Sequence, residues 1–305
     1  MFVEEYLQEL RRERYAPRAF LNYLRRVANR SRDAMVANPG AVRSVWTVGL
    51  AFFAVAFLAA VMIALRFDRH LAYDFFLRTA LWILPAFGFV TLNLEHLRDK
   101  EGYALSALNV PTVLTLLRVV LVPGIALFLL ERHFPLALTT FLIAALSDVA
   151  DGWTARRWKQ ETKLGAVLDP VVDIVFNLAM FFALMAARLL PVWVFAVAAL
   201  RYGILLVGGA SLYLFVGPLR IRPTFFGRAT GVVMSTLVAF LLCLRVVQGP
   251  IAEVLLPLTE IALGVLLGAT VIQVVVLGWY NLKLMTGEMA RARGRVVGDV
   301  RWDAR

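Results

Sequence analysis

LSDVADGWTARRWKQETKLGAVLDPVVD, residues 146–173, sets four aspartates at the edges of two apolar segments: Asp148, Asp151, Asp169 and Asp173. The first two are three residues apart and the last two are four apart, so each pair shares one face of a helix. The basic loop RRWKQETK lies between the pairs. If the two segments are antiparallel neighbouring helices, all four carboxylates come together near one membrane surface.

The composition around this stretch is that of a membrane protein. Of the 305 residues 61% are hydrophobic, and the mean hydropathy is +0.75, whereas ordinary globular domains are about half apolar. Apolar runs of about 20 residues are long enough to cross a bilayer. Eight such runs occur, at 45–66, 76–94, 112–130, 135–152, 166–187, 191–215, 229–248 and 254–280. Because every backbone group in a bilayer needs a partner, we predict an all-α polytopic membrane protein.

The net charge of +11 is unevenly distributed. Nine Arg against five acids lie in residues 1–44, four basic residues in 154–163, three Arg in 216–230 and six basic residues after Tyr280. The alternate loops are short and nearly balanced. The positive-inside rule therefore predicts that both termini and the aspartate loop are cytoplasmic. Since the charges flank spans and form no stripe on a soluble domain, we expect a lipid bilayer as partner and no nucleic acid.

Two further observations limit the class of protein. The single cysteine, Cys243, lies inside an apolar run, which excludes a disulfide framework and a cysteine-based metal site. The first apolar run begins near residue 45, too late for a secretory signal peptide, so no cleavage is expected.

We predict four parts along the chain. A basic amphipathic arm, 1–44, would lie in the cytoplasm or on anionic lipid. A two-span hairpin and connector, 45–106, would precede a six-span catalytic domain, 107–283, and a basic cytoplasmic tail, 284–305.

The four carboxylates would repel one another unless cations lay between them. Carboxylate oxygens suit Mg²⁺ or Mn²⁺, and four such ligands suffice for two ions about 4 Å apart. The small residues Gly152, Ala155 and Gly165 would let a ligand approach the backbone, and Arg156 offers a fork suited to phosphate. The pattern thus predicts a metal and diphosphate site. The alternative is a proton or cation pathway, or ordinary interfacial charges paired with Arg157 and Lys159.

The same residues resemble the signature of the CDP-alcohol phosphatidyltransferase family, D-x2-D-G-x2-A-R-x8-G-x3-D-x3-D. All eight fixed positions are filled over 26 residues, by Asp148, Asp151, Gly152, Ala155, Arg156, Gly165, Asp169 and Asp173. NVPTVLTLLRVVLVP, 109–123, is similar to the opening of the first span in that family, and RPTFFGRATG, 222–231, to a later polar loop. The resemblance covers about residues 107–280 and implies a six-helix bundle, here preceded by two extra spans.

The resemblance also implies roles for these residues. Asp148, Asp151, Asp169 and Asp173 would hold two divalent cations, Mg²⁺ or Mn²⁺, and Asp173 would also act as general base. The nucleotide of CDP-diacylglycerol would be bound by Asp148, Gly152, Ala155, Arg156 and Gly165. The phosphatidyl group would pass to a small alcohol with release of CMP. A homodimer in the inner or plasma membrane of a bacterium is expected.

For the acceptor alcohol we predict a phosphate-binding set of basic and polar residues: Arg118, Arg220, Arg222, Thr224 and Arg228. Glycerol 3-phosphate is favoured because Asp169-Pro170 resembles phosphatidylglycerophosphate synthases, although Ile174 replaces their usual lysine. Inositol phosphate, serine and phosphatidylglycerol are the alternatives. A cation- or proton-coupled transporter is the rival from another class, but such folds carry inverted repeats and broken helices, and the sequence has no sign of either.

Overall fold

The computed structural model describes residues 16–99, 101–209, 211 and 225–299, with the backbone alone for 225–228, 281–282 and 284–299. Within this part the regular elements are all helical. They are α2 (Pro17–Ala37), α3 (Pro39–Arg66), α4 (Arg69–Leu92), η1 (Leu94–His96), α5 (Val110–Leu130), α6 (Phe134–Arg157), α7 (Lys163–Ala186), α8 (Val192–Gly203), η2 (Ile204–Gly208), α10 (Phe225–Val247) and α11 (Pro250–Asp299). Seven helices in the described ranges are long and apolar enough to cross a membrane. The predicted all-α membrane protein is therefore confirmed.

The helix ends differ from the predicted ones because local capping groups extend the helices beyond the apolar runs. The Asn38 side chain accepts a hydrogen bond from the Ala41 amide and starts α3 six residues before the predicted 45. Asp68 accepts from the amides of His70 and Leu71, so α4 begins at Arg69 and not at 76. A helix start is fixed by whichever group satisfies its free amides, which hydropathy does not report.

The predicted span 191–215 is the exception. Its described part is a 12-residue α8 that continues into the 5-residue π-helical η2, and together these are shorter than the other apolar helices. Most of the remaining residues of that predicted span lie outside the described ranges.

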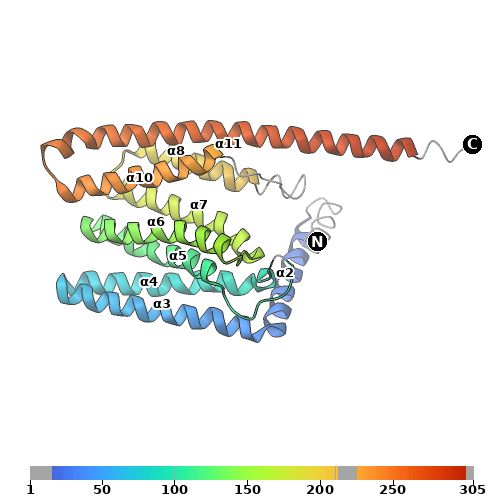
Figure 1. The fold of residues 1–305 in the computed structure, drawn as a ribbon, viewed down its shortest axis with the longest axis horizontal. Helices are drawn as coiled ribbons and strands as arrows, with labels where there is room; N and C mark the ends of the chain where they lie inside the picture. Colours follow the sequence, from blue (N-terminus) through green and yellow to red (C-terminus); the bar gives the residue numbers. More distant parts are fainter. Residues whose placement is uncertain (1–15, 100, 210, 212–224, 300–305) are drawn as a thin grey trace, which may run out of the picture.

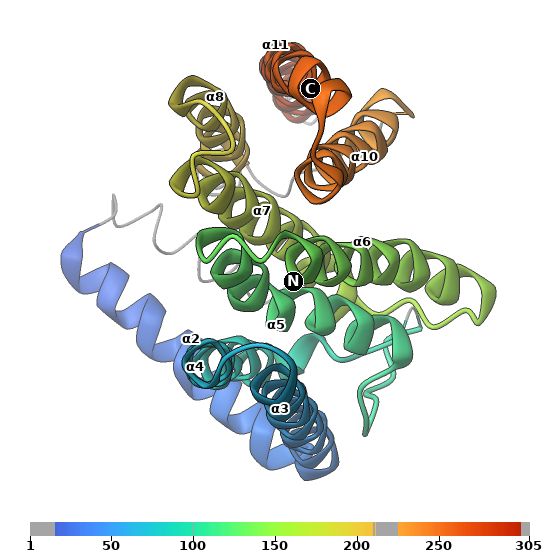
Figure 2. The same cartoon turned by 90° about the vertical axis from the view of Figure 1, so that its left-hand side faces the viewer.

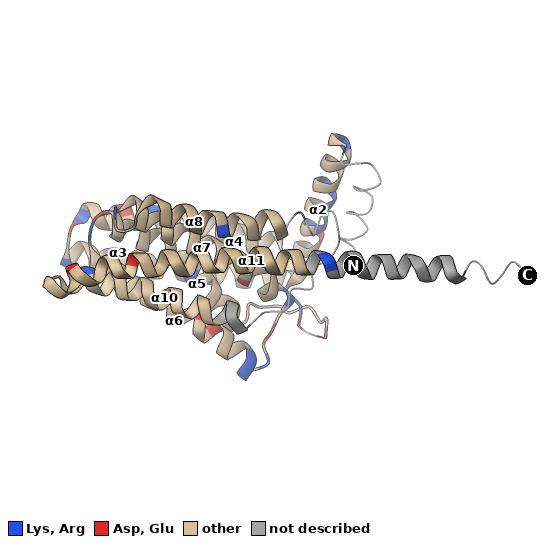
Figure 3. Cartoon of the chain, turned by 90° about the horizontal axis from the view of Figure 1, so that it is seen from above, with Lys and Arg blue, Asp and Glu red and all other residues tan. Residues whose placement is uncertain are grey.

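The spans form three groups (Figures 1 and 2). The central group is α5, α6 and α7; α3 and α4 pack on one side of it through α4 and α5, and α8, α10 and α11 on the other. Helix α2 crosses the bundle at one end (Figures 1 and 3). That end also holds the α6–α7 loop, and it is called the α2 end below.

Large apolar side chains cover the outside of the bundle, among them Leu50, Leu58, Leu65 and Val254. Such a continuous apolar surface is typical of lipid contact. Charged residues lie mainly toward the two ends of the bundle (Figure 3).

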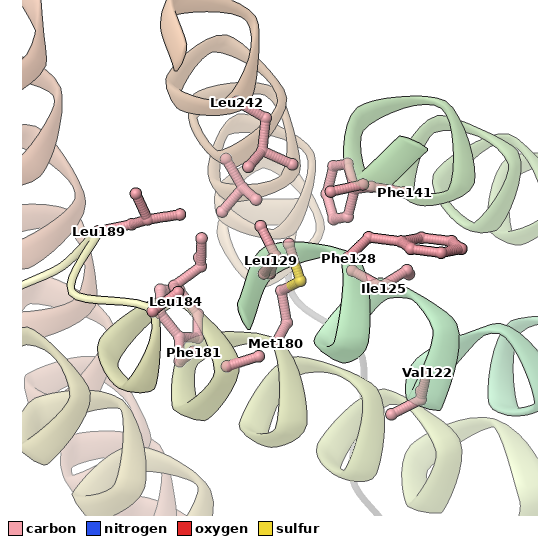
Figure 4. Packing of buried hydrophobic residues seen from close by; sticks show 14 of the residues in the cluster. Val122, Ile125, Phe128, Leu129, Phe141, Met180, Phe181, Leu184, Leu189 and Leu242 are labelled. Atoms are coloured by element: carbon pink, nitrogen blue, oxygen red, sulfur yellow. The ribbon is translucent and has the colours of Figure 1, made fainter. Parts of the chain in front are cut away.

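The core lies where the central group meets the outer helices (Figure 4). Leu129 of α5, Phe141 of α6, Leu184 of α7 and Leu242 of α10 are all at most 2% exposed and belong to one cluster. Because lipid is as apolar as these side chains, close packing and not water exclusion holds such helices together. This cluster fixes α5, α6 and α7 relative to one another on the side of the aspartates that faces away from the α2 end.

Gly124 offers a test of this packing. A Cβ at Gly124 of α5 would lie 2.7 Å from Cε2 of Phe75 on α4, a ring that is buried and stacked on Phe128. We expect Gly124→Ala to lower the free energy of unfolding by about 1–3 kcal/mol, as overpacking does. Gly88→Ala is the matched control, since a Cβ there meets nothing within 4 Å. The midpoint of thermal unfolding in one detergent would compare them, and equal midpoints would contradict the α4–α5 contact.

Candidate active site

Three helices bring the acidic residues together at the α2 end. Helix α6 continues to Arg157, so Asp148 and Asp151 lie within it and not at its end. The loop that follows reverses the chain, with Lys159 in the left-handed region at φ 54°. The side chain of Thr162 then accepts from the Gly165 amide and starts α7. Asp169 and Asp173 therefore stand on the second and third turns of α7. The predicted direct pairing of α6 with α7 is not what joins the aspartates, because both helices pack along α5 and not along each other.

The centre of the cluster is a guanidinium. Arg118 of α5 is only 4% exposed and forms ion pairs with Asp148, Asp151 and Asp173, with 2.7 Å between its Nη2 and Oδ2 of Asp151. Its Nε is buried and has no hydrogen-bond partner among the described residues. Arg118 thus supplies the positive charge that three carboxylates need in a nonpolar surrounding.

Thr115 connects the two aspartate pairs. Its hydroxyl oxygen lies 3.2 Å from Oδ2 of Asp151 and 3.2 Å from Oδ1 of Asp169. Thr115 and Arg118 are three residues apart, so they share one face of α5. This face of α5 meets all four aspartates.

A cavity of about 500 Å³ opens beside the cluster. Its size falls within the usual range of ligand sites, about 300–1,000 Å³. The lining residues come from the start of α5, the end of α6, the loop and the start of α7: Asn109, Pro111, Thr112, Thr115, Asp151, Gly152, Ala155, Arg156, Gln160, Glu161, Thr162, Lys163, Gly165, Ala166 and Asp169.

Four of the five predicted nucleotide residues line this cavity: Gly152, Ala155, Arg156 and Gly165. The fifth, Asp148, pairs with Arg118 in the carboxylate cluster. A Cβ on Gly152 would lie 3.2 Å from Nη1 of Arg156. The missing side chain therefore leaves room for that guanidinium at the cavity wall, where it can meet a phosphate.

The predicted acceptor residues are only partly within the described ranges. Arg220, Arg222 and Thr224 lie outside them, and Arg228 is in α10 with its backbone alone described. Arg118, predicted as a phosphate ligand, contacts the carboxylates in this structure.

The donor chemistry of the cluster suits a divalent cation. All its acidic groups are carboxylates, which is the oxygen set that Mg²⁺ and Mn²⁺ accept, and three of them already surround the cationic group of Arg118. Across the described part of the chain, however, no three His, Cys, Asp or Glu side chains are arranged so that they could hold an ion. The carboxylates are spaced to hold a guanidinium here.

The signature missed several residues that the structure brings to the site. Asn109 accepts from Thr112 and donates to the backbone oxygen of Gln160, so it joins the start of α5 to the loop. Its position before Val-Pro is a recognisable helix start. Thr162 likewise precedes an apolar periodic run and acts as a cap. Gln160 and Asn109 are 51 residues apart, so no local sequence pattern predicts their contact.

Comparison with known proteins gives one family. The family model for CDP-alcohol phosphatidyltransferase matches residues 108–279, more than half of the chain. No solved structure matches the chain.

Three relatives share the name CDP-diacylglycerol–glycerol-3-phosphate 3-phosphatidyltransferase. The protein of Cereibacter sphaeroides is 48% identical over 69 residues, which is 21% of this chain and 31% of the relative. That of Sodalis glossinidius is 45% identical over 95 residues, 30% of this chain and 52% of the relative. That of Aquifex aeolicus is 34% identical over 134 residues, 42% of this chain and 72% of the relative. The first two matches thus cover less than two thirds of the relatives' own length.

Proposed function

The chain belongs to the CDP-alcohol phosphatidyltransferase family, and we propose that it transfers the phosphatidyl group of CDP-diacylglycerol to glycerol 3-phosphate. One observation carries this proposal: the complete signature lies on α6 and α7 with its aspartates gathered beside a cavity of about 500 Å³. The names of the three relatives favour glycerol 3-phosphate over inositol phosphate, serine and phosphatidylglycerol. The comparisons give no support to a cation- or proton-coupled transporter.

In the proposed reaction a hydroxyl oxygen of glycerol 3-phosphate bonds to the phosphorus that carries the diacylglycerol. The bond from this phosphorus to the bridging oxygen of CMP breaks, and CMP leaves with that oxygen. Asp173 takes the hydroxyl proton on a carboxylate oxygen, for which it must come within hydrogen-bond reach of the acceptor. Part of its side chain is accessible in the cluster beside Arg118.

The chain's other residues bind and orient the donor. Arg156, at the cavity wall, would pair with a phosphate of the CDP group, and the absence of bulk at Gly152 and Gly165 would let the nucleotide approach the helix backbones. Asp148, Asp151, Asp169 and Asp173 would hold two divalent cations, Mg²⁺ or Mn²⁺. Such ions stabilise the charge that develops on the phosphoryl oxygens.

The protein is an integral membrane protein, and we further propose that the α2 end faces the cytoplasm of a bacterium. The basic segments 154–163 and α2 lie at that end, as the positive-inside rule requires of a cytoplasmic side. Residues 17–37 of the predicted N-terminal arm form α2, and 39–44 already belong to α3. The exposed apolar side chains Phe20, Leu21 and Leu24 of α2 suit contact with lipid. A homodimer remains part of the proposal.

The proposed function is tested with purified protein, CDP-diacylglycerol and Mg²⁺ or Mn²⁺. We expect CMP release that depends on glycerol 3-phosphate, stops with EDTA and resumes with excess metal, because uncompensated carboxylates neither bind nor activate the diphosphate. Parallel reactions contain inositol phosphate, serine or phosphatidylglycerol in its place. Faster CMP release with one of these would overturn glycerol 3-phosphate as the acceptor. No release with any of the four alcohols, glycerol 3-phosphate included, would overturn the transferase.

A further inference from the structure

The helices before the family match extend to the candidate active site. The match begins at residue 108, so α3, α4 and the connector that follows them all precede it; residues 39–107 are called the two-span unit below. The connector runs at the α2 end of the bundle (Figure 1). There it meets the start of α7, which carries Gly165 and Asp169.

The first contact is apolar. Leu97 of the connector is 0% exposed and belongs to the same buried cluster as Leu164 and Leu168 of α7. These two leucines are four residues apart and share one face of the helix. Gly165 and Asp169 each follow one of them by one residue, so the adjacent face of the same turns lines the cavity. The two-span unit and the cavity therefore contact adjacent faces of the first two turns of α7.

The second contact is a hydrogen bond at the end of the helix. The first amides of an α-helix have no partner within the helix. At α7 the amide of Gly165 donates to the Thr162 hydroxyl, at 3.0 Å. The amide of Lys163 donates to the backbone oxygen of Arg98 in the connector, also at 3.0 Å. One cap thus comes from the signature loop and the other from the two-span unit.

The connector itself is firmly held. The amide of Leu105 donates to the oxygen of Leu97 at 3.0 Å, and the Asn38 side chain donates to the oxygen of Leu105 at 2.8 Å. The amide of Leu108 donates to the hydroxyl of Ser44 at 3.0 Å. The contact surface offered to α7 is therefore fixed to the first turns of α3.

From these contacts we infer that the two-span unit is a positioning element of the nucleotide cavity, with Leu97 as the positioning residue and the Arg98 carbonyl as its polar support. It holds the first turns of α7, and with them Thr162, Lys163 and Gly165 in the cavity wall, against α5. This role rests on the proposed function insofar as the ligand is a CDP-linked lipid. It gives the helices outside the family match a part in substrate binding.

Leu97→Ala in the whole 305-residue chain tests the inference. Loss of the packing lets the start of α7 move and widens the cavity, while Asp173, ten residues after Lys163, stays paired with Arg118 of α5. We expect KM for CDP-diacylglycerol to rise about tenfold with kcat changed less than about threefold. We also expect faster hydrogen exchange of the Lys163 amide, and Leu97→Met should restore both quantities because it conserves volume.

Ile63→Ala is the matched control. Ile63 is a buried residue of the same unit in the other apolar cluster, near the opposite end of α3. The Ile63→Ala substitution should lower the unfolding temperature as Leu97→Ala does. KM for CDP-diacylglycerol and the hydrogen exchange of the Lys163 amide should stay unchanged. The positioning role is wrong if both variants lower the unfolding temperature and leave KM unchanged. It is also wrong if both raise KM equally.

The proposed function and the positioning role fail in different ways. Wild-type protein that releases no CMP from CDP-diacylglycerol would overturn the first. The second would then be decided by hydrogen exchange alone: faster exchange at Lys163 only in Leu97→Ala supports it, and equal exchange in both variants overturns it.

Discussion

Asp169→Asn is expected to lower the rate of CMP release about 10³-fold, because the loss of a carboxylate from the proposed metal site would remove several kcal/mol of transition-state stabilisation. Asparagine has nearly the same shape and still offers an oxygen to Thr115, which lies 3.2 Å from Oδ1 of Asp169. The fold should therefore persist while the charge is lost. The measurement is CMP release at saturating CDP-diacylglycerol and glycerol 3-phosphate.

Asp68→Asn is the matched control for this experiment. Asp68 caps α4 at the end of the bundle far from the cluster, and asparagine caps a helix about as well. The Asp68→Asn variant should release CMP at the same rate as the wild type. Equal activity of Asp169→Asn and Asp68→Asn would contradict the proposed role of the cluster.

Arg118→Met is expected to destabilise the metal-free protein by about 3–5 kcal/mol, the usual result when one partner of a buried ion pair is removed. Three carboxylates would then face one another without the cation that pairs with them in this structure. A divalent cation can take over that charge, so Mg²⁺ or Mn²⁺ should recover much of the loss. Thermal unfolding with EDTA and with excess metal measures both effects.

Arg201→Met serves as the comparison for Arg118→Met. The Arg201 guanidinium contacts the Tyr202 hydroxyl and the Met234 sulfur instead of carboxylates. Its replacement should cost stability that metal does not recover. If metal stabilises the two variants by the same amount, then Arg118 does not act as a counter-ion of the cluster.

Much of the fold could be predicted from the sequence because a bilayer imposes length and hydropathy on each span. The aspartate spacing indicated that the two carboxylate pairs come together. They do so against Thr115 and Arg118 of α5, because α6 and α7 each pack along α5 and not along each other. The helix starts at Pro39 and Arg69 were missed because the side chains of Asn38 and Asp68 cap them. A cap is a local hydrogen bond and leaves no trace in a hydropathy average.

The site was predictable only where its residues are close in sequence. Thr115 and Arg118 reach the aspartates across 30 to 55 positions, so their contacts depend on how α5 packs. The contact of Leu97 with α7 depends on the same packing. Pairings of this kind come from the tertiary structure, and no spacing rule within one segment contains them.

The position of Arg118 has a consequence for how the chain enters the membrane. Its carboxylate partners lie on α6 and α7, which are synthesised after α5. A lone arginine at the middle of a span costs about 2.5–3.5 kcal/mol on insertion scales, and the aspartates of the next two spans carry a similar cost. Each helix by itself is thus a poorer membrane segment than the three together. We expect α5, α6 and α7 to leave the insertion machinery as one group, so that the charges of the proposed active site first serve to assemble the bundle.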